Sequence, residues 1–157
     1  MIFSSLHNTL TPPPGKPIQY STPTIHYNYI YRDHPTAMYP GHFDEVLALA
    51  WSPDGTRIAS GSFDTTVQVW NASNGKRLFT YPDHFNTVYS VAWSPDGTRI
   101  VSSSSDGTVQ IWNADGGKVV YTLRNGGLFV AWSPDSYLIA SGGKDGIVKI
   151  WSAAYLA

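Results

Sequence analysis

Residues 84–112 read HFNTVYSVAWSPDGTRIVSSSSDGTVQIW, and related copies of this text lie before and after them. Trp93 and Trp112 recur 42 residues earlier in the chain and again 39 residues later. The paired positions hold all six tryptophans, namely Trp51 and Trp70, Trp93 and Trp112, and Trp132 and Trp151. The chain therefore contains three copies of one unit of about 40 residues.

Each copy combines short runs of alternating apolar and polar residues with tight turns. Ser-Pro-Asp-Gly stands at 52–55 and 94–97, where the proline and the glycine suit a type I turn, and the third copy has Ser136 in place of the glycine. Alternating runs bounded by turns predict strands, and strand-rich repeats of this length are typical of β-propeller blades. We therefore expect an all-β fold of three four-stranded antiparallel blades.

Four strands, a to d, are predicted for each blade, and the blades are expected at about 42–81, 84–123 and 126–157. The predicted strands are Val46–Trp51, Arg57–Ser60, Thr66–Trp70 and Arg77–Tyr81, then Val88–Trp93, Arg99–Ser102, Thr108–Trp112 and Val119–Leu123, then Leu128–Trp132, Tyr137–Ser141 and Ile147–Trp151. A closing strand near 35–40 precedes them, so the series of twelve begins with a strand d and ends with a strand c.

Composition limits the classes of function. A chain of 157 residues can bury a core, and 14% aromatic with 13% charged residues favours a folded β-rich protein. The net charge of −1 gives no support to nucleic-acid binding through a basic field. The chain has no cysteine, and His7, His26 and His34 lack the spacing of zinc ligands, so we expect no metal and no cofactor.

The first residues read differently from the repeats. Residues 1–23 include Pro12-Pro13-Pro14-Gly15-Lys16-Pro17 and are expected to form a disordered lead-in, with a ligand for a polyproline-binding groove as the less favoured interpretation. The propeller segment is expected over 24–157, with an additional strand at 24–31. The start lacks a basic region followed by an apolar core, so neither a signal peptide nor a membrane partner is expected. A cytoplasmic location is compatible with the absence of cysteine.

The recurrence of spacing, turn and tryptophan resembles the WD-repeat β-propeller family over residues 35–152. Blades of that family carry a His–Ser–Asp–Trp hydrogen-bond set, and the resemblance implies the same set here. The matching positions are His42, Ser60, Asp64 and Trp70, then His84, Ser102, Asp106 and Trp112, then Ser141, Asp145 and Trp151 without a histidine. The near-identical copies, with Ala-Trp-Ser-Pro-Asp present three times, resemble recently amplified prokaryotic members of the family.

Serine, histidine and aspartate together also suggest a nucleophilic triad. The trio recurs in each of the first two blades beside a tryptophan that we expect to be buried, whereas an enzyme needs one exposed site. The repetition favours a structural role. We therefore assign no catalytic residue, and a hydrolase is a remote alternative.

Three blades do not close a ring, because propellers have about 4–8 of them. We expect either an open arc or half of a six-bladed ring, in which two copies of the chain exchange their closing strands. An uncovered blade face of ~300 Å² would forfeit about 8 kcal/mol, which favours self-association. The alternative is that the chain is a fragment of a longer propeller protein.

The family binds partners on the face that carries the d–a loops and b–c turns, and the resemblance implies the same face here. The corresponding positions are Glu45, Leu47, Phe63, Thr87, Tyr89, Ser105, Leu128 and Lys144. Side chains on loops of a rigid scaffold are the usual binding residues. The predicted function is a non-catalytic protein–protein interaction scaffold that binds a protein or peptide. The alternative is a regulatory or sensory part of a larger multidomain protein, such as a kinase-linked propeller.

Overall fold

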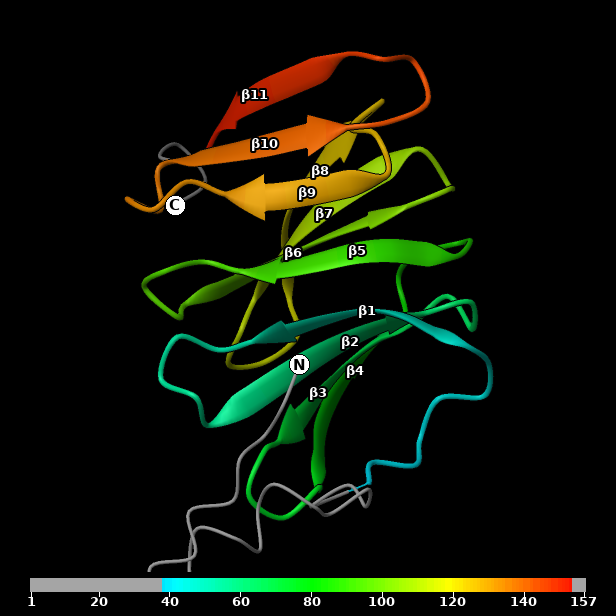
Figure 1. Ribbon diagram of the computed structural model, residues 1–157, viewed down its shortest axis with the longest axis vertical. Helices are drawn as coiled ribbons and strands as arrows, with labels where there is room; N and C mark the ends of the chain where they lie inside the picture. Colours follow the sequence, from blue (N-terminus) through cyan, green and yellow to red (C-terminus); the bar gives the residue numbers. More distant parts are fainter. Residues whose placement is uncertain (1–37, 154–157) are drawn as a thin grey trace, which may run out of the picture. The chain divides into compact units, whose positions relative to one another are not determined.

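The computed structural model describes residues 38–153, which belong to one compact unit of the chain (Figure 1). The described part is built from β-strands, turns and loops, and it contains no helix long and apolar enough to cross a membrane. Its eleven strands are β1 (Val46–Trp51), β2 (Arg57–Ser62), β3 (Val67–Asn71), β4 (Arg77–Tyr81), β5 (Val88–Trp93), β6 (Arg99–Ser104), β7 (Thr108–Asn113), β8 (Val119–Arg124), β9 (Phe129–Trp132), β10 (Leu138–Gly142) and β11 (Val148–Ser152).

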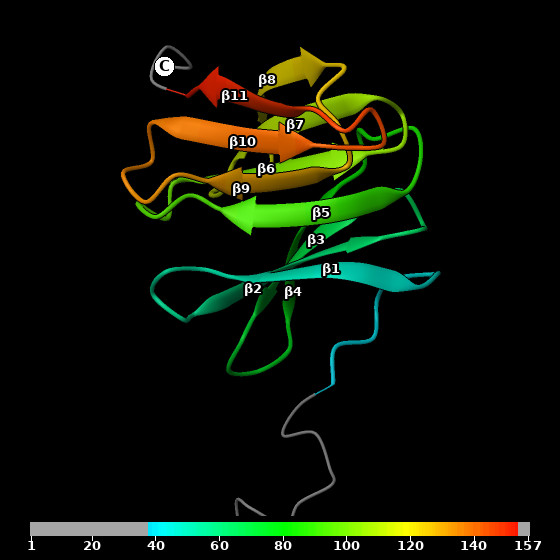
Figure 2. The same ribbon diagram turned by 45° about the horizontal axis from the view of Figure 1, so that its top comes forward.

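The strands form three separate antiparallel sheets. Blade 1 has the order β1-β2-β3-β4, blade 2 has β5-β6-β7-β8, and blade 3 has β11-β10-β9. The first strand of each blade contacts the first strand of the next, so β1, β5 and β9 follow one another through the stack (Figures 1 and 2). The prediction of an all-β fold in three antiparallel blades is confirmed.

The described residues give blade 3 three strands, as expected from a series of strands that ends with a strand c. Residues 35–37 of the predicted closing strand lie outside the described residues, and residues 38–40 form no strand. The predicted lead-in at 1–23 and the strand at 24–31 also lie outside the described residues. Elsewhere the strands differ from prediction by one or two residues at their ends, since β2 and β6 continue to Ser62 and Ser104.

The Ser-Pro-Asp-Gly turns adopt the same backbone in all three blades. Gly55 and Gly97 have φ angles of 69° and 73°, and Ser136 has a φ of 65° at the matching position. Glycine reaches this left-handed region without steric cost, whereas a residue with a side chain is strained there. The third turn therefore keeps its geometry against the conformational preference of serine.

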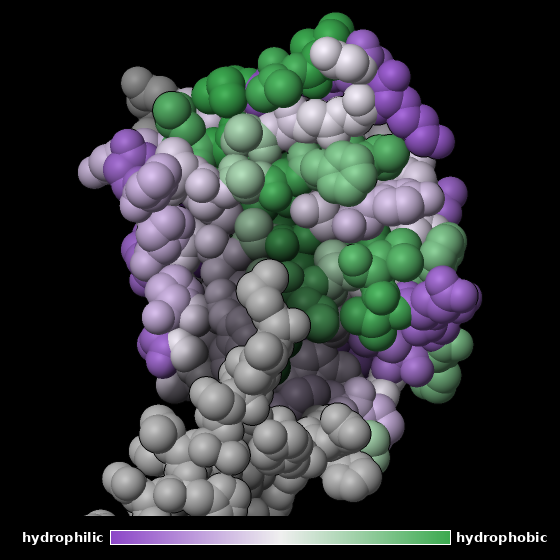
Figure 3. All heavy atoms as spheres, in the orientation of Figure 1, coloured by the Kyte–Doolittle hydropathy of each residue, from purple (hydrophilic) through white to green (hydrophobic). Residues whose placement is uncertain are grey.

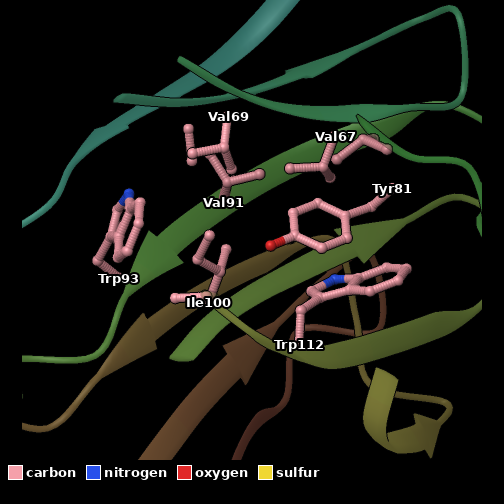
Figure 4. Packing of buried hydrophobic residues seen from close by; sticks show 10 residues of the cluster. Val67, Val69, Tyr81, Val91, Trp93, Ile100 and Trp112 are labelled. Carbon is pink, nitrogen blue, oxygen red and sulfur yellow. The ribbon is translucent and has the colours of Figure 1, made fainter. Parts of the chain in front are cut away.

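The core lies between the blades. Val67 and Val69 of blade 1 pack against Val91 and Ile100 of blade 2 (Figure 4). A second cluster joins blades 2 and 3 and contains Val101, Val109, Ile111, Leu123, Ile139 and Ala153. Each blade has two apolar faces, and each internal interface joins one face of each neighbour. We call the face toward the preceding blade the leading face and the face toward the following blade the trailing face.

Aromatic and cationic side chains reinforce these interfaces. Tyr81, the last residue of β4, stacks on Trp112 of blade 2 with ring centroids 4.6 Å apart (Figure 4). The guanidinium of Arg57 lies 4.7 Å from the ring centroid of Trp93 and donates to the carbonyl oxygen of Ala114 over 3.1 Å. The neighbouring blades are thus fixed by directional contacts in addition to apolar packing.

Candidate functional site

Four buried side chains in blade 2 form a continuous hydrogen-bond relay. The indole Nε1–H of Trp112 donates to Ser102 Oγ over 2.7 Å. Ser102 Oγ lies 2.7 Å from His84 Nε2, and His84 Nδ1 lies 2.9 Å from Asp106 Oδ2. Because His84 lies in the β4–β5 loop and Asp106 in the β6–β7 turn, the relay ties the loop and the turn to β7.

A neutral His84 with its proton on Nδ1 satisfies every member of this relay. Nδ1–H then donates to the carboxylate of Asp106, and Nε2 accepts from the Ser102 hydroxyl, which accepts in turn from the indole. Burial lowers the pKa of His84 below its usual 6.5 and outweighs the opposing effect of Asp106. The buried imidazole is therefore held in the neutral form that the donor pattern requires.

Asp106 carries the charge of the relay. Burial raises the pKa of this carboxyl, but hydrogen bonds from the Thr108 hydroxyl, from His84 and from the Phe85 and Thr108 backbone N–H groups outweigh burial. The pKa of Asp106 therefore lies below its usual 3.8. A carboxylate that accepts several hydrogen bonds is strongly favoured in its ionised form.

Blade 1 contains the same relay. Trp70 Nε1 donates to Ser60 Oγ over 2.8 Å, and His42 lies 2.7 Å from both Ser60 Oγ and Asp64 Oδ2. Burial raises the pKa of Asp64, but hydrogen bonds from Thr66, from the Phe43 backbone N–H and from His42 lower it to about 2. The residues spaced 22 apart in the sequence thus meet in space in both blades.

Blade 3 retains only the end of the relay. Trp151 Nε1 donates to Ser141 Oγ over 2.7 Å, and among residues 38–153 no histidine binds this serine. Asp145 instead pairs with Lys149 Nζ at 2.9 Å, and the same ammonium donates to the carbonyl oxygen of Asn125 over 2.8 Å. Lys149 therefore joins the β10–β11 turn to the β8–β9 loop, which is the connection that histidine makes in the other blades.

The relays do not suit nucleophilic catalysis. Ser102 has no exposed surface, and its oxygen already binds the indole and the imidazole. A nucleophilic serine must reach a substrate carbonyl beside an oxyanion hole. Within residues 38–153, no group of three or more His, Asp or Glu side chains could hold a metal ion.

A groove of about 350 Å³ lies between blades 2 and 3, on the face that carries the β4–β5 and β8–β9 loops. Its apolar wall is formed by Tyr89 of β5 and by Leu128, which precedes β9. Ser105 contributes a hydroxyl, and Lys144 and Lys149 contribute ammonium groups. Asp145 neutralises Lys149, whereas Lys144 is an exposed cation at the groove. The groove thus combines an aromatic ring, an aliphatic side chain and a positive charge.

The groove coincides with the shortest of the repeats. The third copy is three residues shorter than the other two around Asn125-Gly126-Gly127, as the spacings of 42 and 39 residues show. A Cβ on Gly126 would lie 2.4 Å from Val109 Cγ2, and one on Gly127 would lie 2.6 Å from the carbonyl oxygen of Gly142. The shortened loop therefore lies so close to β7 and β10 that only glycine fits.

The structure brings together half of the residues predicted on sequence grounds to bind a partner. Tyr89, Ser105, Leu128 and Lys144 all line the groove, and Phe63 contacts Tyr89 with ring centroids 6.5 Å apart. Phe63 and the other three predicted residues, Glu45, Leu47 and Thr87, do not line the groove themselves. Thr87 is only 6% exposed and its carbonyl oxygen accepts the backbone N–H of Ser105, so its side chain is part of the interior.

Sequence reasoning missed the roles of Asn125 and Lys149. Lys149 occupies the strand position of Gln68 and Gln110, whose side chains donate to the carbonyl oxygens of Gly41 and Asp83 over 3.1 Å. The sequence did contain a signal for the role of Lys149. The third repeat lacks the histidine, and it has a cation where the other two repeats have glutamine.

Comparison with known proteins agrees with this geometry. The family model described as WD domain, G-beta repeat matches residues 33–71, 75–113 and 117–152. The second match runs from β4 to β7, and the third runs from β8 to β11. The second and third repeats therefore each begin with the outer strand of one blade and continue into the next blade.

Individual relatives match over shorter lengths. The chain is 51% identical over 35 residues to Protein HIRA of Zea mays, which covers 22% of this chain and 4% of that protein. It is 47% identical over 45 residues to Protein Notchless of Drosophila melanogaster, covering 29% of this chain and 9% of that protein. It is 38% identical over 55 residues to WD repeat-containing protein slp1 of Schizosaccharomyces pombe, covering 35% of this chain and 11% of that protein. Each match is therefore a small part of a much longer protein.

Proposed function

Because the chain belongs to the WD-repeat family, we propose that it is a non-catalytic interaction scaffold that binds a protein or peptide segment. The binding face carries the β4–β5 and β8–β9 loops, and the groove between blades 2 and 3 is its centre. The observation that supports this proposal most is that Tyr89, Leu128 and Lys144, from two different blades, line one groove of about 350 Å³.

The chemistry of the groove favours a segment with an apolar side chain next to a carboxylate. The ring of Tyr89 and the side chain of Leu128 offer an apolar wall, and aromatic anchors commonly dominate binding at protein interfaces. Lys144 is exposed, so its ammonium is available to a carboxylate of the ligand. An acidic residue or a free C-terminus beside a leucine or phenylalanine has the required combination.

The hydrogen bonds made by the serine, histidine and aspartate side chains support a non-catalytic role. The serines, histidines and aspartates that resemble a triad are consumed in the relays of blades 1 and 2. The groove holds no histidine, and its aspartate, Asp145, is paired with Lys149. Binding is thus the activity for which this face is equipped.

A peptide library panned against the purified chain tests the proposal. We expect the selected peptides to be enriched in an acidic residue next to an apolar one. Tyr89→Ala is expected to weaken their binding by at least about tenfold, which corresponds to about 1.4 kcal/mol. Lys144→Glu is expected to weaken the acidic peptides more than the corresponding amides, and fluorescence anisotropy measures both effects.

Matched variants away from the groove serve as controls. Tyr121 is an exposed tyrosine of β8, and Lys118 is an exposed lysine that immediately precedes β8. Neither residue lines the groove. Tyr121→Ala and Lys118→Glu should leave binding unchanged. Peptides that bind equally well to Tyr89→Ala, Lys144→Glu and the unaltered chain would contradict the proposed site.

We place the scaffold in the cytoplasm, and we propose that copies of the chain associate through the apolar faces that blades 1 and 3 leave exposed. A regulatory module within a larger protein is the second candidate, favoured by the same exposed faces, which further blades of a longer chain could cover. Fractionation of cells that produce the tagged full-length gene product tests both the location and the length.

A further inference from the structure

The two internal interfaces reveal how a leading face and a trailing face fit together. At the interface of blades 1 and 2, the leading face contributes Val88, Val91 and Trp93 of β5. The trailing face contributes Val67 and Val69 of β3. Trp93 Nε1 also donates to the carbonyl oxygen of Ala50 over 3.1 Å. Blade 1 also has a leading face and blade 3 also has a trailing face, and these two faces lie at the two ends of the stack.

The outermost faces carry the same apolar pattern without cover. Trp51 of blade 1 is 61% exposed, whereas its counterpart Trp93 in blade 2 is 7% exposed. Val148 of blade 3 is 74% exposed, whereas its counterpart Val67 in blade 1 is fully buried. The remaining members of this set are Val46 and Leu49 on blade 1 and Phe129, Leu138 and Ile150 on blade 3. Apolar side chains gather along the outer edge of blade 3 (Figure 3, top).

The outer half of the open leading face of blade 1, around Trp70 of β3, is covered by another residue of the same chain. Tyr39 packs on Trp70 with ring centroids 5.9 Å apart and donates its hydroxyl to the carbonyl oxygen of Ala72 over 2.8 Å. Tyr81 at the end of β4 packs on Trp112 in the same way and donates to Asn113. Tyr39 thus stands where the fourth strand of a preceding blade would end. The inner half, with Leu49 and Trp51, stays open.

The open trailing face of blade 3 has the complementary composition. Blade 3 presents strands β9, β10 and β11, and within the described residues no strand pairs with the outer edge of β11. A blade that docks on blade 1 must supply its first three strands but not its fourth, because Tyr39 already occupies that place. Blade 3 is a blade of this kind, so the two open faces are matched in chemistry and in extent.

We propose that a second copy of this chain covers both faces, so that two chains close a ring of six blades. Blade 1 of each copy docks on blade 3 of the other, which makes two equivalent head-to-tail contacts related by a twofold axis. In each contact Leu49 lies against Ile150 of the other copy, as Val91 lies against Val69 within the chain (Figure 4). Trp51 lies beside the Ala131 carbonyl, as Trp93 does beside that of Ala50.

This inference rests on the proposed association of copies but not on the proposed peptide groove. Six blades fall within the range of about 4–8 that closes a propeller. The contact repeats a surface that the chain already forms twice between its own blades, which is why a second copy fits better than an unrelated protein. Leu138 takes the position of Arg57 and Arg99, so the new contact is more apolar than the internal ones.

Light scattering after size exclusion measures the mass of the full chain. We expect twice the 17.2 kDa of one chain at micromolar concentration. Trp51→Glu and Ile150→Glu should each give the mass of a single chain, because both contacts of the ring then contain one altered face. Phe85→Glu is the matched control, since Phe85 is an exposed loop residue outside both faces, and it should keep the doubled mass. Near-ultraviolet circular dichroism verifies that each variant retains its packed tryptophans.

A mixture of the two monomeric variants tests the head-to-tail arrangement. The Trp51→Glu copy has an intact blade 3 and the Ile150→Glu copy has an intact blade 1, so one sound contact can form between them. We expect the mixture to recover the doubled mass with a Kd at least about tenfold weaker than that of the unaltered chain. Contact between two blade 1 faces would leave Ile150→Glu dimeric, and that result would overturn the proposal.

The remaining outcomes also decide the question. A folded, unaltered chain that keeps the mass of one copy at high concentration would refute a second copy and point to further blades of a longer protein. Masses that grow with concentration would show head-to-tail contacts that do not close, which also refutes the two-chain ring. Peptide binding by the Trp51→Glu monomer separates failure of the ring from failure of the groove, because the two sites share no residue.

Discussion

Lys149 Nζ donates a hydrogen bond of 2.8 Å to the carbonyl oxygen of Asn125, in the one blade that lacks a relay histidine. The same ammonium lies 2.9 Å from Asp145 Oδ2, so one cation joins a loop and a turn that blades 1 and 2 join through an imidazole. The imidazole connection is buried, whereas the side chains of Lys149 and Asp145 are partly exposed. The two connections should therefore differ in strength.

Replacing Lys149 by methionine is expected to destabilise blade 3 by about 0.5–1 kcal/mol, because partly exposed ion pairs contribute little. Hydrogen exchange of the β11 amides should accelerate, while that of β7 stays unchanged. Lys149→Gln restores the residue type of blades 1 and 2 and can still reach the Asn125 carbonyl, so its effect should be smaller. Equal acceleration in β7 would contradict a local role.

Asp106→Ala is expected to lower the free energy of unfolding by about 1–3 kcal/mol, because it leaves His84 Nδ1–H and the Thr108 backbone N–H without their acceptor. Urea unfolding followed by tryptophan fluorescence measures the loss. Asp145→Ala is the matched control, since Asp145 has no histidine partner and is partly exposed. A loss for Asp106→Ala that does not exceed that of Asp145→Ala would refute the buried relay.

Gly127→Ala is expected to disturb blade 3 more than any other change of glycine to alanine in its loop. Gly127 has a φ of 91°, and a Cβ there would lie 2.6 Å from the Gly142 carbonyl oxygen. Strain and overlap together predict a loss of more than about 2 kcal/mol. Gly116 has nothing within 4 Å of its Cβ and no positive φ, so Gly116→Ala should be neutral. Thermal unfolding compares the two variants.

Stability is expected to fall in two steps as the solution is acidified. The pKa of His84 is lowered by burial, so the unfolded chain takes up a proton first and the contribution of His84 declines once the pH drops below about 6.5. The pKa of Asp64 is about 2, so its contribution is complete above about pH 4 and is lost as the pH falls toward 2.

The upper step identifies the histidine. His84→Gln removes the group whose pKa is lowered by burial, so the decline in stability below about pH 6.5 should disappear while the carboxylate step remains. Urea midpoints measured across the pH range provide the profile. A slope between pH 7 and 5 that survives in His84→Gln would assign the upper step to another group.

The strands and the relays were accessible to sequence reasoning because they depend on local pattern and fixed spacing. Alternating residues place Val88–Trp93 in a strand, and the 22-residue separation of His84 and Asp106 brings the two side chains within 2.9 Å. The third strand a begins one residue later than expected, at Phe129. Its neighbour Leu128 belongs to the β8–β9 loop and donates its backbone N–H to the Gly142 carbonyl oxygen.

Other features depend on contacts between residues that are distant in the sequence, which no local pattern encodes. Thr87 occupies a loop position in the sequence, yet its carbonyl oxygen binds Ser105 and its side chain is buried. Tyr39 reads as part of a strand, but it acts as an aromatic cover for Trp70. The groove could not be foreseen because it arises where a shortened loop, a turn and the first strands of two blades meet.

The third repeat is three residues shorter than the other two, and the effect of this difference is confined to its own blade. Blades 1 and 2 each contain a complete relay, so the stack does not depend on a relay in blade 3. The shorter repeat instead contains a lysine that joins its loop to its turn, and a groove lies beside that loop. In such an array, one repeat can carry a new surface feature while the other repeats keep their buried connections.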